Sequence, residues 1–459
     1  MLALLGSACG TTSPVLDTLI INANVIDVEA GTVTPNQYIG IRGDSIVFVG
    51  DSNRDPKLGV SFDFAQDIDA AGAYAMPGLW DGHIHLRGGD SLQAENKALL
   101  PLFLAHGITS VRDAGGDLTA AVLRWRDEAA TGQLASPYIY TSGPKIDGPK
   151  PRWGGSLEVE SAQEIAAGID SLEQLGVEYV KIYDSTLDEK VFYEIVRKAE
   201  ARGLPVTGHM PMDADLLKAA TLGLDGVEHL YYFLAASSSA GDSIRALGLG
   251  YRSIPLLLDS YNEELAQKAF SELAARDFYA TPTLHIGHVL EALHTETHEN
   301  DELLALIGPG IQRSYAGRTR GARSRSLSAQ ANEARLRAHF DAMVLPLHEA
   351  GVHLIAGSDC GAFNSYVYPS QSLHAELAAL VTAGLTPREA LLASIQAPAR
   401  FLNVSAAYGS LHAGAVADII LLTQNPLDDI SALGSLTHTI ARGRVYDRES
   451  LDSFMDPQK

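Results

Sequence analysis

Hydrophobic and polar positions follow different patterns at the ends of the chain and in its middle. Near both ends, short apolar or alternating runs are separated by turns such as Gly43-Asp44, which is typical of short strands. These runs are Leu19–Ile26, Gln37–Arg42, Ser45–Gly50, Ala417–Leu422 and Ala441–Tyr446. The middle alternates apolar runs with amphipathic stretches. The pattern therefore predicts β-rich ends around a region of alternating strands and helices.

The middle region contains a series of strand candidates that alternate with helices. The strand candidates are Leu79–His85, Ile108–Arg112, Tyr138–Thr141, Tyr179–Tyr183, Pro205–His209, Gly226–His229, Phe278–Thr283 and His353–Gly357. Amphipathic stretches such as Ala162–Leu175, Asp188–Arg202 and Leu373–Gly384 separate them. Eight repeats of a strand and a helix predict an α/β fold, namely a parallel (β/α)8 TIM barrel.

These patterns divide the chain into a barrel and a smaller domain. We assign residues 76–406 to the barrel, and residues 15–75 and 407–459 to a small β-sandwich domain formed from the N- and C-terminal segments. The stretch from His285 to Leu347 is longer than one helix needs. We expect it to supply several helices and a loop over the barrel mouth.

The composition narrows the kinds of partner. Of the 459 residues, 34 are Lys or Arg and 56 are Asp or Glu, which gives a formal net charge of −22. So acidic a chain repels phosphate backbones, and we expect no nucleic-acid partner. The apolar runs fall short of the roughly 18 residues that a membrane span needs. We expect a small-molecule substrate, and a homo-oligomer stays open.

The two cysteines have different implications. Two are too few for a disulfide framework or a thiolate zinc site. Within residues 1–14, Cys9 follows an apolar stub and small residues, which resembles the end of a bacterial lipoprotein signal. This pattern predicts export, with a lipid anchor at Cys9 on the periplasmic or outer surface. The alternative is an incidental cysteine in a cytoplasmic protein. We expect Cys360 to pack inside the protein.

Metal-binding side chains stand where the predicted strands end. His83 and His85 are two residues apart in the first barrel strand, so both imidazoles project from one face. His209, His229 and Asp359 end later strands. Because the carboxyl ends of barrel strands meet on one rim, these side chains are expected to converge. Such a set of ligands suits a divalent ion such as Zn²⁺.

Lys181 lies in an apolar strand, where an isolated ammonium group would be costly to bury. It could extend to water or pair with Asp184. Alternatively, CO₂ could carboxylate its amine, which would turn a cation into a carbamate anion able to bridge two metals.

Several stretches resemble the amidohydrolase superfamily, in its imidazolonepropionase-related and prolidase-like dipeptidase branch. The resemblance spans about residues 17–450. It rests on Met76–His85, Gly107–Gly116, Thr281–Leu284, Leu373–Pro387 and Gly414–Leu422 with the following Asn425-Pro-Leu.

The resemblance implies a binuclear metal centre, with zinc as the expected metal. His83, His85 and Asp359 would hold the buried ion, and His209 and His229 would hold the exposed one. A carboxylated Lys181 would bridge both. The metals would lower the pKa of a bridging water, which would then lose a proton and become hydroxide. They would also polarise the substrate carbonyl. Asp359 would take the proton of that water and pass it to the leaving amine.

Other residues near the expected rim are candidates for contacts with substrate or ligands. Trp153 lies in the loop after the third strand, where relatives often carry a His. Tyr231 follows the sixth strand, and a Tyr near that place contacts the substrate carboxylate in related dipeptidases. His285 follows the seventh strand and could line the pocket. Arg112 and Asp113 end the second strand and are expected to brace the ligands.

Three functions stay open at this point. The leading hypothesis is a metal-dependent hydrolase of amide C–N bonds that acts on a dipeptide or an N-acyl amino acid. The second keeps the same centre and opens a cyclic amide, an imidazolone or a lactone. The third is an inactive binding barrel, which the complete set of ligands disfavours. His294 and His298 are interpreted as part of an exposed helix. The serine-hydrolase elbow and the phosphate- and dinucleotide-binding glycine loops are absent from the sequence.

Overall fold

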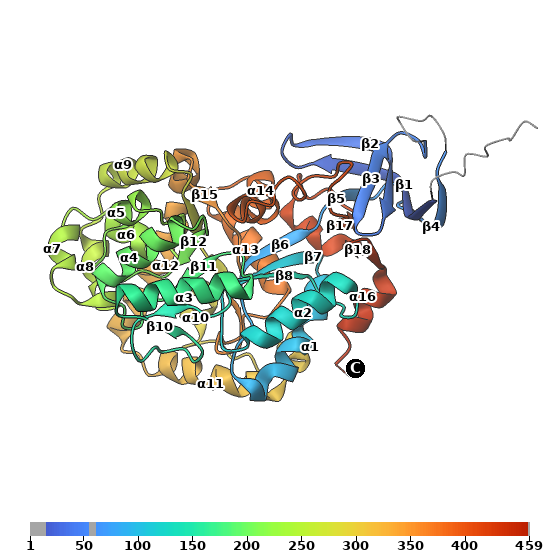
Figure 1. Ribbon diagram of the computed structural model, residues 1–459. Helices are drawn as coiled ribbons and strands as arrows, with labels where there is room; N and C mark the ends of the chain where they lie inside the picture. The colour runs from blue at the N-terminus through green and yellow to red at the C-terminus, as the bar shows by residue number, and fades with distance from the viewer. Residues whose placement is uncertain (1–14, 55–60, 458–459) are drawn as a thin grey trace, which may run out of the picture.

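The computed structural model describes residues 15–54 and 61–457 and confirms the predicted barrel class. Figure 1 shows the strands at the centre of the larger part of the molecule, with helices around them. The barrel strands are β6 (Leu79–His85), β7 (Ile108–Asp113), β8 (Tyr138–Thr141), β11 (Val180–Ile182), β12 (Val206–Gly208), β13 (Gly226–Glu228), β14 (Tyr279–Thr281) and β15 (His353–Leu354). The short strands β9 (Ile146–Asp147), β10 (Leu157–Glu158) and β16 (Cys360–Gly361) extend the ladders at the rim.

Parallel pairing joins neighbouring barrel strands into three ladders: β16-β6-β7-β8, β10-β9-β11-β12 and β13-β14-β15. Backbone hydrogen bonds connect one ladder to the next. The N–H of Glu178 donates to Thr141 (3.1 Å), and that of Asp225 donates to Val206 (3.0 Å). The N–H of Gly82 donates to Ala356 (2.9 Å), which links the last strand to the first and closes the circle.

The helices around the barrel begin and end where the sequence supplies caps. In α3 (Ala162–Leu175), Ser161 and Glu164 form a reciprocal capping box, and Gly176 ends the helix in the left-handed region. The other outer helices are α1 (Gln93–Leu104), α2 (Thr119–Thr131), α4 (Glu189–Glu200), α5 (Leu216–Thr221), α6 (Tyr231–Ala236), α7 (Gly241–Arg245), α8 (Ile254–Asp259), α9 (Glu263–Ala274), α13 (Gln371–Thr382), α14 (Pro387–Ile395), α15 (Ala397–Phe401) and α16 (Arg448–Phe454). None of the described helices is both long and apolar enough to cross a membrane.

Strands from both ends of the chain form the smaller domain. They are β1 (Val15–Asp27), β2 (Thr32–Arg42), β3 (Ser45–Gly50), β4 (Asp63–Asp69), β5 (Tyr74–Pro77), β17 (Ile419–Leu422), β18 (Leu436–Ala441) and β19 (Arg444–Tyr446). Hydrogen bonds join them in one mixed sheet, in which β17 pairs antiparallel with β5. Alternate residues of β17 serve two cores: Ile419 and Leu421 lie in the core of the smaller domain, and Ile420 and Leu422 lie in the main core. This alternation fastens the smaller domain to the barrel.

The stretch between β14 and β15 supplies several helices, as predicted. They are α10 (Leu284–Ala292), α11 (Pro309–Arg323) and α12 (Leu327–Ala350), with the short 3₁₀ turn Glu302–Leu306. The predicted helix through His294 and His298 is wrong, because α10 ends at Ala292 and both residues lie in a turn and loop. The loop side chains find partners locally, since His298 Nδ1 lies 2.9 Å from an Asp301 oxygen.

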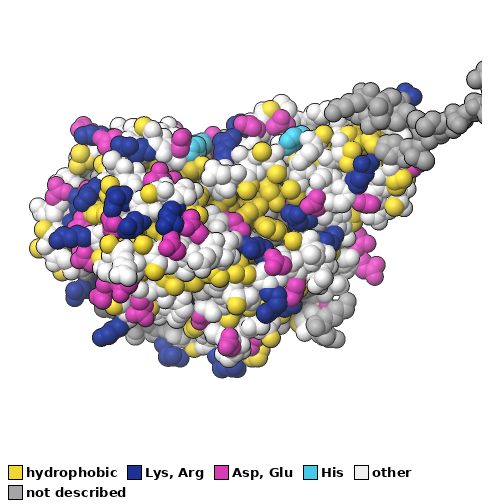
Figure 2. All heavy atoms as spheres, in the orientation of Figure 1, with side chains coloured by type: hydrophobic (Ala, Val, Ile, Leu, Met, Phe, Trp, Pro, Cys, Tyr) yellow, Lys and Arg dark blue, Asp and Glu magenta, His cyan; other side chains and the backbone are white. Residues whose placement is uncertain are grey.

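Cys360 is buried on β16, and burial raises the pKa of its thiol well above the ordinary value, which agrees with the predicted packing role. Cys9 lies outside the described residues. On the face seen in Figure 2, acidic and basic side chains are intermixed.

Candidate functional site

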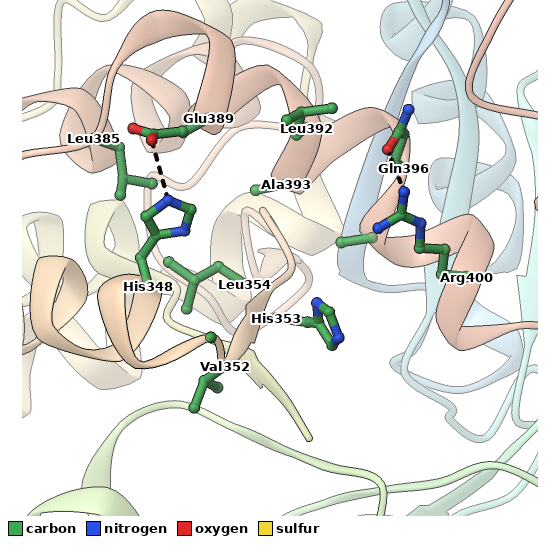
Figure 3. A pocket seen from close by; sticks show the side chains of 12 residues that line it. His348, Val352, His353, Leu354, Leu385, Glu389, Leu392, Ala393, Gln396 and Arg400 are labelled. Atoms are coloured by element: carbon green, nitrogen blue, oxygen red, sulfur yellow. Dashed lines mark hydrogen bonds and ion pairs between the residues drawn. The ribbon is translucent and has the colours of Figure 1, made fainter. Parts of the chain in front are cut away.

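Cavities lie at both ends of the barrel strands. One, of about 230 Å³, lies beside the start of β15 (Figure 3). Its polar groups already have partners: His348 pairs with Glu389 at 3.2 Å, and Arg400 donates to Gln396 at 2.8 Å. Barrel enzymes carry their chemistry at the carboxyl ends of the strands, so this cavity is at the wrong end for a catalytic site.

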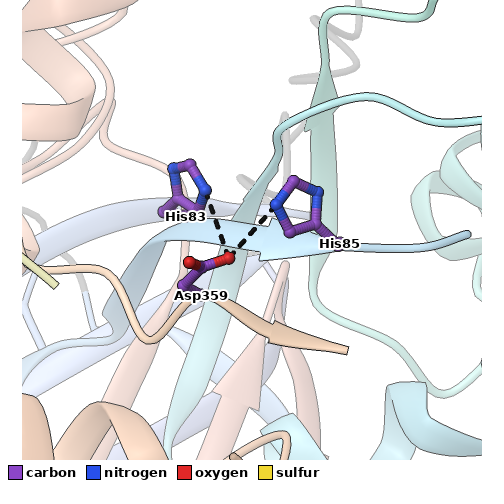
Figure 4. Close-up of side chains that lie close together, drawn as sticks. All are labelled: His83, His85 and Asp359. Atoms are coloured by element: carbon purple, nitrogen blue, oxygen red, sulfur yellow. Dashed lines mark ion pairs between the residues drawn. The ribbon is translucent and has the colours of Figure 1, made fainter. Parts of the chain in front are cut away.

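Three of the predicted ligands meet at the carboxyl end of the barrel. His83 Nε2 lies 3.5 Å and His85 Nε2 lies 3.2 Å from Asp359 Oδ1 (Figure 4). One potential ligand atom from each residue falls within 4.8 Å of the others, and all three residues are buried. Strand β6 places both imidazoles on one face, as the spacing of two residues predicts.

Local contacts hold the Asp359 loop against β6. The Asp359 backbone N–H donates to the His83 carbonyl (2.7 Å) although its own φ is +55°, a left-handed conformation. The Asp81 carboxylate accepts from the N–H (2.9 Å) and hydroxyl (2.6 Å) of Ser358. A side chain at Gly361 would place its Cβ 2.1 Å from the His85 carbonyl oxygen, so the loop can approach this closely only with glycine there.

The other predicted ligands extend this group along the rim. His229 Nε2 lies 3.8 Å from Asp359 Oδ2, and the rings of His229 and His209 have centroids 4.9 Å apart. Lys181 is buried on β11, with its Nζ 3.4 Å from Glu228 Oε1. The alternative partner Asp184 instead accepts a hydrogen bond from the Tyr251 hydroxyl (2.9 Å). The structure thus brings all the sequence-predicted ligand candidates to one rim.

Glu228 is a central residue of the site that the sequence analysis did not single out. Its Oε2 lies 2.7 Å from His83 Nδ1, and its Oε1 lies 3.0 Å from Arg112 Nη2. Burial alone would raise the pKa of this carboxyl, but the charges of Arg112, Lys181 and His83 hold it well below its usual range. The available signal was an acidic residue inside the buried strand β13, directly before a candidate ligand.

The predicted brace by Arg112 and Asp113 acts at two separate places. Arg112 donates to the Gly82 carbonyl (2.5 Å) and to Glu228, and so supports His83 indirectly. Asp113 instead accepts from the Leu86 N–H (3.0 Å) and the Thr141 hydroxyl (2.8 Å). Both therefore support the strand ends that carry the candidate ligands.

The chemistry of these side chains fits a divalent metal ion. Burial lowers the pKa of His85 and His209 well below the ordinary value, and that of His229 to about 4, so these rings are neutral at pH 7. Neutral imidazole and carboxylate are the forms that bind metal. His83 binds Glu228 through Nδ1, which leaves Nε2 toward Asp359, the arrangement expected of a histidine oriented for a metal.

A second cavity, of about 390 Å³, opens directly over these side chains. Trp153 and Tyr231, both predicted substrate contacts, line it, as do His85, His209, His229 and Asp359. Ile286, Gly287 and Leu290 of α10 form part of its wall. The neighbouring His285 donates its backbone N–H to Glu376 at 2.7 Å. Five arginines also line this cavity, namely Arg87, Arg152, Arg318, Arg325 and Arg337.

Comparison with known families identifies the class of protein. The Amidohydrolase family matches residues 74–446, which is most of the chain. The chain therefore belongs to the Amidohydrolase family, a family of metal-dependent hydrolases that act on C–N bonds.

Individual proteins match this chain at low sequence identity. "Adenine deaminase 3" of Rhizobium meliloti (strain 1021) is 32% identical over 316 residues, which is 64% of this chain and 48% of that protein. The chain spans about half the length of this curated relative. Among solved structures, Bottromycin amidohydrolase superposes with a TM-score of 0.73 at 21% identity, over 95% of this chain and 88% of that one. A putative prolidase from Bifidobacterium longum superposes with a TM-score of 0.67 at 23% sequence identity, over 96% of this chain and 99% of that one. At these identities the structures establish a shared fold.

Proposed function

We propose that the protein is a binuclear metal-dependent hydrolase of amide C–N bonds, with dipeptides or N-acyl amino acids as substrates. The observation that carries this proposal is the set of ligand-type side chains around Asp359, beneath a cavity lined with arginines. A substrate of this class brings a carboxylate that those arginines can bind and an amide that can reach the rim.

The proposed ligands are His83, His85 and Asp359 for one ion and His209 and His229 for the other, with carboxylated Lys181 between them. Divalent ions such as Zn²⁺, when bound, supply an acidified water and polarise the substrate carbonyl. Carboxylation of Lys181 would keep one N–H on Nζ, which can still donate to Glu228 at the observed 3.4 Å. The same reaction would remove an ammonium group that burial already disfavours, since burial lowers the pKa of Lys181 to about 8.

Asp359 is the proposed catalytic residue. Burial opposes its charge, but the side chains of His83 and His85, which hydrogen-bond to the carboxylate, hold its pKa well below the usual range. At neutral pH it is therefore a carboxylate that can accept the proton of the attacking water. Asn364 donates to Asp359 Oδ1 (2.7 Å) and fixes the orientation of the carboxylate. The same group would then give the proton to the departing amine, which leaves poorly unless protonated.

Tyr231 and Trp153 are the proposed substrate contacts on either side of the rim. The Tyr231 hydroxyl lies 3.4 Å from Arg337 Nη2, so a carboxylate at this place could meet a hydroxyl and a guanidinium together. Trp153 offers an apolar face that the side chain of a substrate can cover. His285 stays a candidate because it lies in the first turn of α10, next to Ile286 and Gly287, which line the cavity.

The alternative substrates are cyclic amides, imidazolones or lactones, on the same centre. Deamination of a purine also belongs in the comparison, because sequence relatives are named adenine deaminases. A neutral purine has no charge for the arginines, which favours the amide substrates.

The test is metal analysis of the purified protein together with a substrate panel. The panel holds dipeptides, N-acyl amino acids, a dihydropyrimidine, a lactone and adenine. We expect close to two divalent ions per chain and the highest kcat/KM on a substrate with a free carboxylate. The Asp359→Asn variant controls for contaminating hydrolases. Full activity of metal-free protein, or turnover confined to adenine or the lactone, would contradict the proposal.

We also propose that Cys9 carries a lipid anchor that places the enzyme at the cell surface or in the periplasm. Support comes from the sequence pattern around Cys9 alone. In the native host, the wild-type protein should sediment with membranes and Cys9→Ser should not. Equal amounts of both in the soluble cytoplasmic fraction would refute the anchor.

A further inference from the structure

Two arginines share one neutral acceptor beside Asp359. Arg87 Nη2 donates to Asn364 Oδ1 at 3.1 Å, and Arg318 Nη2 donates to the same oxygen at 2.6 Å. The amide nitrogen of Asn364 donates to Asp359 Oδ1 at 2.7 Å. Both arginines line the cavity over the candidate metal site. Two positive groups thus meet at an uncharged amide, close to where substrate would lie.

Neither guanidinium has a carboxylate partner at ion-pair distance among residues 15–54 and 61–457. Arg87 is only 4% exposed; its Nε donates to the Ala362 carbonyl (3.0 Å), and its guanidinium lies 4.1 Å from the centroid of the Trp153 ring. Arg318 reaches the same place from α11. Two like charges this close to one another are costly unless an anion joins them.

Two arginines on another wall of the cavity share one carboxylate, that of Glu333. Arg337 Nη2 lies 2.8 Å from Glu333 Oε1, and Arg325 Nη1 lies 4.0 Å from Glu333 Oε2. Arg152 also lines the cavity without an ion pair among the described residues, but only Arg87 and Arg318 converge on one acceptor, although the chain as a whole has an excess of acidic residues. The missing anionic partner of these two guanidiniums is therefore expected to come from the substrate.

We propose that Arg87 and Arg318 bind a second carboxylate of the substrate, so that the enzyme prefers acidic substrates such as dipeptides or N-acyl amino acids containing Asp or Glu. This rests on the proposed amide hydrolysis. One carboxylate meets Tyr231 and Arg337, and the side-chain carboxylate meets the pair on Asn364. Two guanidiniums can hold a carboxylate with several charge-assisted hydrogen bonds, which a neutral amide of the same shape cannot form.

The experiment compares kcat/KM for isosteric substrates, Ala-Asp against Ala-Asn and Asp-Ala against Asn-Ala. Wild type should prefer the carboxylate in one of these pairs by at least about tenfold, equivalent to about 1.4 kcal/mol. Arg318→Gln should abolish the preference, and Arg318→Lys should restore part of it. Arg313→Gln, an exposed residue on the same helix, is the matched control and should keep the full preference. A ratio is measured, so a general loss of folded enzyme does not change it.

Direct binding separates this proposal from the proposed function. Succinate and its neutral analogue succinamide are titrated into metal-loaded wild type, Arg318→Gln and Arg313→Gln. If no amide substrate is hydrolysed, but succinate binds at least tenfold more tightly than succinamide and only Arg318→Gln loses the difference, the anion site stands and the proposed function fails. If peptides are hydrolysed with equal kcat/KM for acid and amide, or if Arg318→Gln keeps the preference, the anion site is refuted.

Discussion

Replacing Glu228 by Gln removes one negative charge from a fully buried network without changing the size of the side chain. Both Glu228 and its partner Arg112 are 0% exposed. Arg112 would keep its bonds to the Gly82 carbonyl and the Thr281 hydroxyl but would lose its only carboxylate partner among the described residues. Breaking a buried pair from one side costs about 3–5 kcal/mol, because a charge is left uncompensated. For a chain of this length that corresponds to a fall in Tm of about 3–5 °C.

The same substitution should weaken metal binding. Glu228 holds His83 Nδ1 at 2.7 Å, and losing such a partner of a metal-bound histidine typically costs 10–100-fold in affinity. We would measure melting of chelator-treated protein, and metal affinity by competition with a chromophoric chelator. Glu299→Gln is the control, since it removes the same charge from an exposed loop position. If Glu228→Gln melts within 1 °C of Glu299→Gln and holds metal equally well, the reasoning about this network is wrong.

The pH dependence of stability provides an independent check of the Glu228 network. The pKa of Glu228 is held well below its ordinary value in the folded protein, so the carboxylate stabilises the fold above the unfolded pKa, near 4.5. That contribution is lost as the pH falls toward the folded pKa. The difference in Tm between wild type and Glu228→Gln should therefore stay constant from about pH 6 upward and shrink below about pH 4.5. A difference that grows on acidification would contradict this sign.

The remaining predictions concern the proposed ligands. Lys181→Ala should lose metal and nearly all activity, with partial recovery in acetate or propionate, whereas Lys181→Arg should not recover because its fixed charge repels the metals; retention of two metals and wild-type turnover in Lys181→Ala would exclude the bridge. Asp359→Asn should retain much of its metal in elemental analysis but lose turnover by about 10²–10⁴-fold, because an amide cannot carry the proton; an undiminished kcat would exclude Asp359 as the proton carrier. Prolonged chelation should abolish activity, and added Zn²⁺ should restore it; activity that survives without bound metal would exclude the metal centre.

Some elements were predictable to the residue because local sequence determines them. The bounds of β6, β8 and α3 coincide with the predictions, and α3 carries both a capping box at Ser161 and a left-handed Gly176. By contrast, β15 is only His353–Leu354. The Ile355 N–H still donates to the Ala280 carbonyl (2.8 Å), but the Ala356 N–H donates to Ala393 outside the sheet, and the chain then places Asp359 beside His83. Tertiary contacts shorten a strand that its apolar residues would extend.

Some residues of the candidate site could likewise be predicted from local sequence, and others could not. The candidate ligands His83 and His85 were predictable because two residues spaced by two in a strand point to the same face. Glu228 and Arg318 were not, because what they do depends on contacts with residues far away in the sequence: Glu228 meets Arg112 across 116 positions and His83 across 145. An acidic residue in a buried strand or an arginine in a surface-type helix has many ordinary explanations until the chain is folded.

The network around Glu228 is better explained by function than by stability. Apolar residues of similar volume would stabilise this part of the core at least as well as a buried ion pair does, because desolvation of the charges consumes most of their attraction. What apolar residues could not do is fix the imidazole of His83 through Nδ1 and hold Lys181 in reach of the same carboxylate. One buried carboxylate therefore contacts a proposed ligand from β6 and a proposed ligand from β11 at once, while Arg112 from β7 anchors it. These buried charges cost stability, and they lie where the proposed metals require a rigid set of ligands.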